Sequence, residues 1–373
     1  MTLVSGLGGQ LTVDLGALAR NWRALDQVSA GALTGAVVKA DAYGTGIVEA
    51  SKALYAAGAR FFFTATPDEA IKVRATLQDV HIFVLNGLYP GAANLYIRQN
   101  LMPVISSMAM LEEWLAKCLE RNEAYPAALH FDTGMNRLGF RLNEAGLVRS
   151  RIEQLGYAPQ MVMSHLACAD QPNHEKNRTQ LALFSSIMAQ FPGIPASLAN
   201  SAGVMAGRDY HFQMVRPGIA LYGGRAVTGR KNPMAPVVSL HVPVLQVKEG
   251  RTGETVGYGA TYTLSRDSRL AVISHGYADG FFRSLSGSTT RPGAKVAVRG
   301  RLCPVIGRIS MDLSVIDITE LGSDVPYPGE GIEILGPNVG ADDLADAGGT
   351  IGYEILTSLK GRYTRHHVGG AES

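Results

Sequence analysis

Cysteine, net charge and long apolar runs are all scarce in this sequence of 373 residues. Its three cysteines, Cys118, Cys168 and Cys303, are widely separated, which excludes a disulfide framework and a paired metal-binding motif. The 34 basic residues nearly balance the 32 acidic ones, and a formal charge of +2 provides no basic field for nucleic acid or an anionic membrane. No run approaches the roughly 20 apolar residues that cross a bilayer.

The first ten residues also lack the basic and apolar regions of a signal peptide. We therefore expect a cytoplasmic protein that acts on a small molecule, with no metal site. The 46% apolar and 18% charged residues are typical of a globular protein, and the chain is too long for one compact core, which predicts two domains.

Between residue 30 and about residue 225, short apolar runs alternate with helical patterns. The best-marked helix start has Thr66 as N-cap, Pro67 in the first turn and Glu69 three residues after the cap. Eight units of this kind predict a (β/α)8 TIM-type barrel of parallel strands, an α/β fold. The expected strands are Ala36–Val38, Arg60–Thr64, Ile82–Leu85, Pro103–Ile105, Ala128–Phe131, Met161–Met163, Ala196–Leu198 and Ile219–Leu221.

After Pro233 the helical periodicity nearly vanishes, and short alternating runs punctuated by glycine and proline appear at Val242–Val247, Leu270–Ile273 and Lys295–Val298. This pattern predicts antiparallel strands, with one or two short helices in residues 341–359. We expect a barrel in residues 1–232 and a second, mostly β domain in residues 233–373. The strand and helix expected in residues 10–25 fit either domain.

Residues with chemical potential follow the predicted barrel strands, at the end where barrel enzymes place their active sites. Lys39 directly follows the first strand, where desolvation lowers the pKa of a lysine and favours the neutral amine that forms imines. A lysine reaching from a strand end to water is the alternative. The other residues of this ring are Arg137, His165, Asn200, Ser201 and Gly218.

The last two loops of the ring suit a phosphate group. Residues 199–203 and 217–219 are mostly small, so backbone amides can approach phosphate oxygens, and Ser201 adds a hydroxyl. Together with an imine-forming lysine they indicate an aldehyde-bearing phosphate cofactor. Arg137 offers a planar fork to a carboxylate, although a solvated loop arginine is the alternative.

Nine motifs, in order along the chain, resemble the alanine racemase family. They are AVVKADAYGTG (36–46), DTGMNRLGF (132–140), MSHLACAD (163–170), ANSAG (199–203), VRPGIALYG (215–223), VGYGATY (256–262), GYADGFFR (276–283), GRISMD (307–312) and TIGYEILTSL (350–359). The resemblance implies a barrel that binds pyridoxal 5'-phosphate (PLP), followed by a β domain. It also implies an isomerase that interconverts L- and D-alanine by two-base proton transfer at Cα of the PLP external aldimine.

The resemblance assigns roles to individual residues. Lys39 would carry the cofactor and serve the D-side proton, and Tyr258 of the partner subunit would serve the L-side proton, so a homodimer with shared sites is implied. The substrate carboxylate would meet Arg137 and the Met311 backbone. The cofactor would contact Tyr43, His165, Asn200, Ser201, Arg216, Gly218, Ile219 and Tyr353, with Arg216 at the pyridine nitrogen and His165 linking it toward Tyr258. The entrance corridor would hold Asp170, Tyr277, Arg283, Arg308 and Asp312.

The sequence departs from the family pattern at two positions. The family often has a lysine two residues before the DTGM motif, which becomes carbamylated and orients the carboxylate-binding arginine. That position is His130 here, so carbamylation there is excluded, and Arg137 must be held by His130 or by a bound anion. Ser310 stands where a cysteine is frequent, and we expect little consequence.

Other functions stay open at this stage. A racemase of the same fold for serine or a broader set of amino acids is the main alternative. A related decarboxylase of basic amino acids would need a polar pocket for a long side chain. A non-catalytic PLP-binding protein would not need Tyr258 and Met311, and a barrel enzyme for phosphate-bearing substrates would use Lys39 without PLP.

Overall fold

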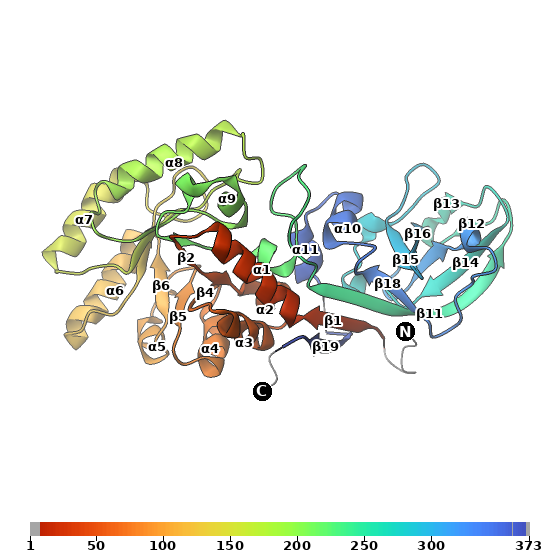
Figure 1. Ribbon diagram of the computed structural model, residues 1–373, viewed down its shortest axis with the longest axis horizontal. Helices are drawn as coiled ribbons and strands as arrows, with labels where there is room; N and C mark the ends of the chain where they lie inside the picture. Colours follow the sequence, from red (N-terminus) through yellow and green to blue (C-terminus); the bar gives the residue numbers. More distant parts are fainter. Residues whose placement is uncertain (1–7, 360, 371–373) are drawn as a thin grey trace.

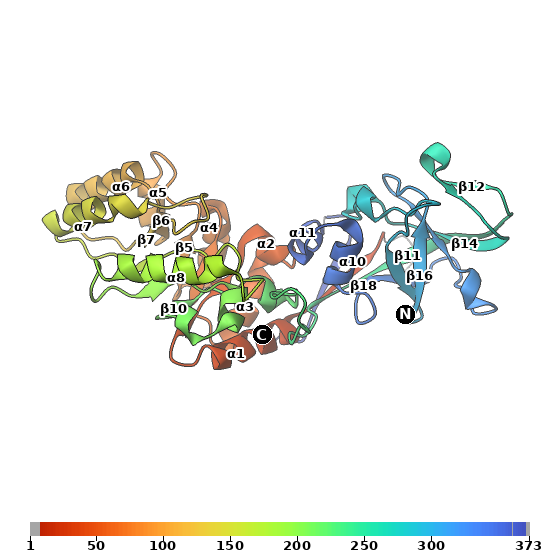
Figure 2. The ribbon, with the colours of Figure 1, turned by 90° about the horizontal axis from the view of Figure 1, so that it is seen from above.

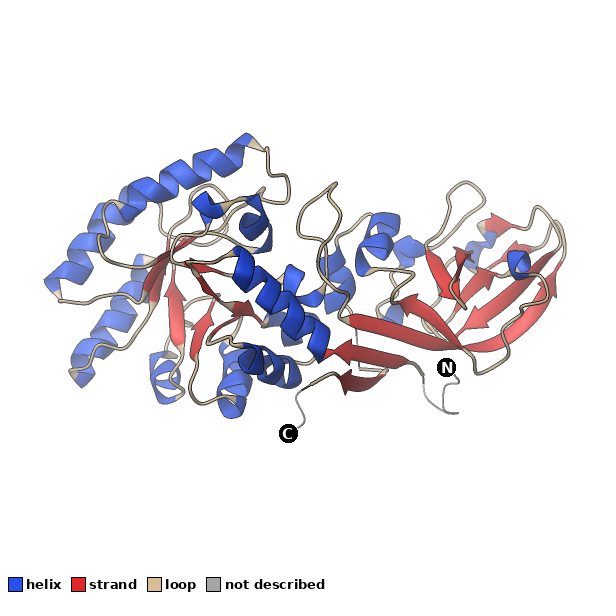
Figure 3. Cartoon of the chain, in the orientation of Figure 1, coloured by secondary structure: helices blue, strands red, loops and turns tan. Residues whose placement is uncertain are grey.

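The computed structural model describes residues 8–359 and 361–370, so most of the segment tested for a signal peptide lies outside the described residues. The molecule is elongated, with a barrel at one end and an antiparallel sheet at the other (Figure 1). Helices surround the barrel, whereas strands dominate the other end (Figure 3). Within the described ranges, no helix is both long and apolar enough to cross a membrane.

The barrel strands are all parallel and form one sheet. In chain order they are β2 (Leu33–Thr34), β3 (Ala36–Val37), β4 (Phe61–Thr64), β5 (His81–Val84), β6 (Met102–Ile105), β7 (Ala128–His130), β8 (Met161–Met163), β9 (Ala196–Ser197) and β10 (Met214–Val215).

The sheet closes because β2 and β3 are two halves of one strand. β2 pairs with β10, and β3 pairs with β4. Gly35 joins the two halves, and a Cβ there would lie 2.6 Å from the Phe63 ring, so the bend accepts only glycine without rearrangement. The strands are buried on both faces, which explains their nearly continuous apolar sequence. The predicted (β/α)8 barrel is thus confirmed.

The last predicted strand was wrong. The eighth strand is Met214–Val215, and Ile219–Tyr222 forms a 3₁₀ turn, η3. Pro217 has no N–H for a ladder, and the chain turns at Gly218. The side chains of η3 are buried, and apolar character alone does not distinguish a buried turn from a buried strand. As a result, residues 216–219 lie just beyond the strand, at the same end as Lys39.

The barrel helices follow their strands, except α1, which precedes β2. They are α1 (Leu15–Val28), α3 (Ile47–Ala57), α4 (Pro67–Thr76), α5 (Ala93–Arg98), α6 (Met108–Arg121), α7 (Ala145–Gln154), α8 (Glu175–Met188) and α9 (Ser201–Ala206). The predicted start of α4 is confirmed, because Thr66 Oγ1 accepts a hydrogen bond from the Glu69 amide at 3.4 Å. Glu69 in turn accepts from the amides of Ala65 and Ala40, which ties α4 to the segment after β3.

The second sheet consists mainly of antiparallel strands. They are β11 (Val238–Gly250), β14 (Ser268–Ile273), β15 (Lys295–Val298), β16 (Arg301–Ile306), β17 (Ser314–Asp317) and β18 (Gly331–Leu335), with a hairpin of β12 (Thr255–Val256) and β13 (Tyr262–Thr263) beside them. The helices expected in residues 341–359 are α10 (Ala341–Gly348) and α11 (Gly352–Thr357). They lie between the barrel and the second sheet (Figure 2).

Both ends of the described chain join the second sheet. β1 (Gln10–Asp14) pairs antiparallel with β11 and parallel with β19 (Thr364–Val368), whereas α1, which follows β1 directly, packs on α3 of the barrel. The segment 10–25, which the sequence left unassigned, therefore contributes to both parts. The expected boundary at residues 232 and 233 falls in the connection between η3 and β11.

A left-handed turn follows the first barrel strand. In the segment α2 (Lys39–Tyr43), Ala40, Asp41, Ala42 and Tyr43 all have φ between 53° and 54°. Each non-glycine residue in this conformation costs about 1–2 kcal/mol, because its Cβ crowds the following carbonyl. Four in succession persist only where surrounding contacts hold them.

Candidate active site

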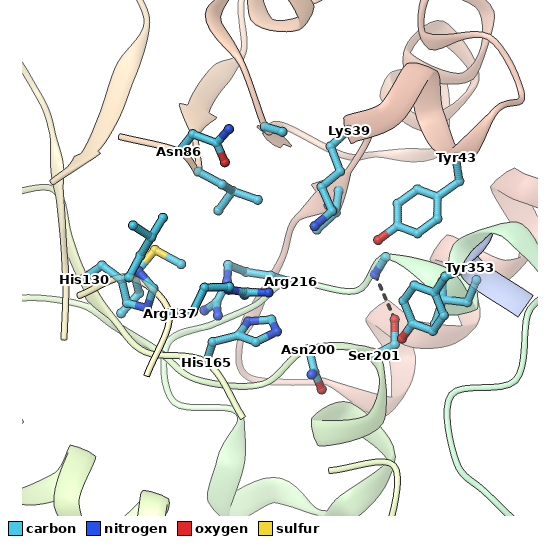
Figure 4. Close-up of a pocket in the computed structure, with 17 residues that line it drawn as sticks. Lys39, Tyr43, Asn86, His130, Arg137, His165, Asn200, Ser201, Arg216 and Tyr353 are labelled. Carbon is cyan, nitrogen blue, oxygen red and sulfur yellow. Dashed lines mark hydrogen bonds between the residues drawn. The ribbon is translucent and has the colours of Figure 1, made fainter. Parts of the chain in front are cut away.

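A cavity of about 360 Å³ opens at the carboxyl ends of the barrel strands. Ten of the predicted site residues line it: Lys39, Tyr43, Arg137, His165, Asn200, Ser201, Arg216, Gly218, Ile219 and Tyr353. Figure 4 shows the labelled side chains converging on one space, with Lys39 and Tyr43 approaching it from the same segment. The predicted residues in the cavity thus come from the segments after five barrel strands and from α11.

Lys39 enters the cavity from the end of β3. Burial lowers the pKa of its ammonium, and the nearby Arg137 guanidinium lowers it further, while Glu69 acts in the opposite direction. A larger fraction of Lys39 is therefore in the neutral amine form than for an exposed lysine. An amine in this state can form an imine with an aldehyde or accept a proton from carbon.

Two backbone amides and the Ser201 hydroxyl meet in the loop beside Tyr43. Ser201 Oγ accepts hydrogen bonds from the Gly218 amide at 2.8 Å and the Ala220 amide at 3.3 Å. Both N–H groups converge on the Ser201 hydroxyl, and a phosphate oxygen that took its place would meet the same donors. Asn200 caps the short helix α9 through the Gly203 amide.

Gly218 is required for this close packing. A Cβ at Gly218 would lie 2.3 Å from the Tyr43 hydroxyl. Tyr43 stacks on Tyr222, with 4.6 Å between ring centroids, and its ring lies 6.1 Å from that of Tyr353. Burial raises the pKa of the Tyr43 phenol and raises that of Tyr353 to about 12, so both hydroxyls stay protonated and can donate hydrogen bonds to an anion. These donors fit the phosphate of PLP.

Arg216 is a buried cation at the cavity. Its guanidinium donates to Ser197 Oγ and to the Ser164 carbonyl at 2.6 Å, and its side chain is almost fully buried. Burial lowers the pKa of Arg216 to about 9, which leaves it charged at neutral pH. Burial and the Arg216 charge hold the pKa of His165 well below its usual value, so this imidazole is neutral.

Arg137 lies in the loop after β7, where Asp132 accepts hydrogen bonds from three successive backbone amides and fixes the loop. Its guanidinium is exposed, and among the described residues no side chain hydrogen-bonds it. Burial, followed by the charges of Arg216 and Arg137, lowers the pKa of His130 to about 4. His130 is therefore a neutral neighbour of Arg137, and the described contacts do not include a hydrogen bond between the two.

Tyr258 and Met311 lie outside this cavity. Both belong to the second part of the chain, and their side chains are 69% and 52% exposed. Tyr258 lies in the 3₁₀ turn η4 (Tyr258–Ala260). Met311 is in the turn after β16, where its carbonyl accepts from the Ala278 amide at 3.0 Å. The described chain thus forms the cavity without these two predicted residues.

Sequence reasoning missed some residues that line or support the cavity. Asn86 lines it from the end of β5, and the rule that strand ends carry the site would have found it. Tyr222 supports Tyr43 from within the VRPGIALYG motif. Glu69 holds the backbone beside Lys39, and its capping position gave the only sequence signal.

Comparison with known proteins covers both parts of the chain. The family described as "Alanine racemase, N-terminal domain" matches residues 13–226, and "Alanine racemase, C-terminal domain" matches residues 237–367. An alanine racemase of Rhizobium meliloti is 49% identical, with 97% of each chain covered. A biosynthetic alanine racemase of Agrobacterium fabrum is 47% identical, with 96% of this chain and 93% of the relative covered.

A solved structure gives the same result. The crystal structure of alanine racemase from Bartonella henselae with covalently bound pyridoxal phosphate superposes with a TM-score of 0.91 at 37% identity. The superposition covers 97% of this chain and 99% of that one. Family match, sequence identity and fold agree over nearly the whole length, and the chain belongs to the alanine racemase family.

Proposed function

We propose that this protein is a PLP-dependent alanine racemase that interconverts L- and D-alanine. One observation carries the proposal: a lysine with a lowered pKa shares a cavity with a set of donors suited to phosphate and with the buried cation Arg216. When bound, PLP supplies an aldehyde that condenses with amines and an electron-withdrawing ring that acidifies the Cα proton of an attached amino acid.

The cofactor is held at both ends by this chain. The Gly218 and Ala220 amides, Ser201 Oγ and the hydroxyls of Tyr43 and Tyr353 would bind its phosphate. Lys39 Nζ would join its aldehyde carbon. Arg216 would face the ring nitrogen and donate a hydrogen bond, and because a guanidinium holds its proton strongly, it would not transfer a full proton there.

Racemisation requires proton transfer on both faces of the substrate. With substrate bound at the cofactor, Lys39 Nζ would be the group that accepts or returns the Cα proton on the D side. Its lowered pKa makes the neutral amine available for this step. Arg137 would bind the substrate carboxylate, since its guanidinium points into the cavity (Figure 4) and makes no hydrogen bond among the described residues.

The opposite face needs a second proton carrier, and we assign it to Tyr258 of a second subunit. In one subunit Tyr258 and Met311 are exposed and lie away from the cavity. A second copy that brings them to the cavity mouth would complete the site, with the Met311 backbone near the carboxylate. Neutral His165, beside Arg216, would link the cofactor region to Tyr258. The proposal thus includes a homodimer with shared sites, acting in the cytoplasm.

Proton exchange measured by NMR tests this function. Purified enzyme with PLP in D2O is given L-alanine or L-serine, and we expect the Cα proton of alanine to be lost as D-alanine appears. Lys39→Ala should abolish both changes. Faster exchange of serine than of alanine would transfer the assignment to a serine racemase. A visible cofactor band without Cα exchange for either substrate would contradict racemisation and favour a cofactor-binding protein or a decarboxylase.

A further inference from the structure

The left-handed turn Ala40–Tyr43 determines where two cavity groups stand. Lys39 precedes the turn and Tyr43 ends it, and both side chains point into the cavity (Figure 4). The path of four backbone residues therefore fixes the spacing between Lys39 Nζ and the Tyr43 hydroxyl. Because the four residues carry a Cβ, this path is strained, and relaxation toward ordinary φ values would separate the two groups.

Contacts within the barrel support the turn at several points, including a backbone hydrogen bond from the Ala42 amide to the Val38 carbonyl at 2.9 Å. The Ala40 amide donates to Glu69 Oε1 at 2.6 Å, at the beginning of the turn. Asp41 Oδ1 accepts from the Ile47 amide at 2.9 Å, which connects the turn to α3. The carbonyls that follow the turn, those of Gly44 and Thr45, find side-chain donors elsewhere.

These donors come from the last strand of the described chain. Arg365 Nη2 donates to the Gly44 carbonyl at 2.9 Å, and Nη1 lies 3.6 Å from Asp41 Oδ2. His367 Nε2 lies 3.0 Å from the Thr45 carbonyl. The two residues are 321 and 322 positions away from their partners, so the contacts are purely tertiary. Arg365 Nε is buried without a hydrogen bond among the described residues, and the guanidinium therefore acts through its two terminal nitrogens.

The strand pairing aims both side chains in one direction. β19 pairs with β1, with Arg365 opposite Leu11 and His367 opposite Val13, and residues two apart on a strand share a face. α11, which carries Tyr353, packs on the same turn: a Cβ at Gly44 would lie 2.3 Å from the Leu356 carbonyl. The turn and α11 lie side by side (Figure 2). The turn is thus contacted from outside the barrel by both β19 and α11.

We propose that Arg365 and His367 are positioning residues for the cofactor site: by holding the left-handed turn from β19, they keep Lys39 and Tyr43 at the spacing that PLP binding requires. This inference rests on the proposed function. Arg365 and His367 do not line the cavity, and they act on the cofactor only through the turn.

The test compares Arg365→Gln with Arg225→Gln. Arg225 is a matched control, because it also forms an ion pair between the two parts of the chain, with Asp346, and has a similar side-chain exposure of 33% against 29%. The readouts are the PLP dissociation constant, from titration of the visible cofactor band, and kcat and KM separately. We expect Arg365→Gln to raise the dissociation constant roughly tenfold and to lower kcat, and Arg225→Gln to change neither by more than about twofold.

A rescue distinguishes positioning from general destabilisation. Glycine adopts positive φ without strain, so Ala40→Gly should restore PLP affinity in the Arg365→Gln background. His367→Ala, which removes one contact from an exposed residue, keeps the test available if Arg365→Gln does not fold, and we expect it to raise the dissociation constant about threefold.

Two outcomes would overturn different claims. Equal PLP affinity and equal kcat in the Arg365→Gln and Arg225→Gln proteins, or no effect of His367→Ala where only that variant folds, would overturn the positioning role. So would failure of Ala40→Gly to restore affinity. The wild type should show a visible cofactor band that Lys39→Ala abolishes. If the wild type shows no such band, the proposed function is overturned instead.

Discussion

At the scale of single residues, Arg216 is a charged side chain in a buried position, where desolvation costs free energy. It is buried beside neutral His165 and held by Ser197 and the Ser164 carbonyl. A carboxyl group at this position would exchange a proton with the ring nitrogen and strengthen the electron withdrawal of the cofactor. We expect Arg216→Glu to lower racemase kcat roughly 100-fold and to release up to one pyruvate per site, with the amino group of alanine transferred to the bound PLP.

Pyruvate is measured with lactate dehydrogenase during incubation with L-alanine. Arg216→Lys is the control, because it preserves a cation and should not produce pyruvate. An Arg216→Glu enzyme that releases no more pyruvate than the wild type would refute the assigned role of the guanidinium.

His275 controls stability rather than chemistry. It is 2% exposed, and burial lowers its pKa to about 3 from an unfolded value of 6.5. Between these values the unfolded chain binds a proton that the folded chain does not, so this contribution to stability is complete above pH 6.5 and is lost as pH falls toward 3. The free energy of unfolding should fall by about 1.4 kcal/mol per pH unit from this group alone.

His275→Phe removes this proton while preserving the ring contact with Phe281. Tyr363, which lies 3.3 Å from His275 Nδ1, retains its hydrogen bond to the Asp279 carbonyl. Urea unfolding at several pH values and one protein concentration gives the free energy of unfolding. Its fall with decreasing pH should be smaller in His275→Phe than in the wild type by about 1.4 kcal/mol per pH unit. Identical slopes for variant and wild type would show that His275 is not the responsible group.

At the scale of elements, the loop after β10 can pack against Tyr43 only because residue 218 is a glycine. A Cβ at Gly218 would press on the Tyr43 hydroxyl, and overpacking of this kind costs about 1–3 kcal/mol. We expect Gly218→Ala to weaken PLP binding about 5- to 150-fold, measured by cofactor titration. Gly146→Ala is the control, since its Cβ would meet no atom within 4 Å. Unchanged affinity in Gly218→Ala would show that the loop and Tyr43 do not form the phosphate site together.

Most elements of the barrel could be predicted from the sequence. Strands buried on both faces leave continuous apolar runs, and seven of the eight predicted runs overlap a barrel strand. The eighth run failed because η3 is equally buried. Most of the predicted site residues line the cavity, because strand ends share one end of a barrel and because the motifs resemble a known family.

Tertiary features left no such signal. Nothing in Ala40–Tyr43 announces a left-handed turn, since the turn contains no glycine and its strain is offset by distant contacts. Likewise, the position of Gly35 as a bend between β2 and β3 depends on the Phe63 ring, which only folding brings near. Periodicity describes how a segment meets the core and carries no information about which distant atom it meets.

At the scale of the whole molecule, the shared site can be tested by mixing defects. Co-expression of Lys39→Ala and Tyr258→Phe subunits should produce heterodimers with one intact site, although each variant alone is inactive. Random pairing predicts about a quarter of wild-type activity. If Tyr258 acted within its own subunit, both sites of the heterodimer would be damaged and activity would not recover. Purified heterodimers, separated by two different affinity tags, give the cleanest comparison.

The pairing of β1 with β19 also sets an order for biosynthesis. The first described strand pairs with the last one, and the side chains of β19 reach the turn beside Lys39. A chain emerging from the ribosome folds its early segments first, so the barrel can form while β19 is still being synthesised. The lysine turn then lacks its outer support until β19 has been made and has paired with β1. Cofactor capture is therefore expected only after β19 has joined β1, which keeps shorter nascent chains from binding PLP.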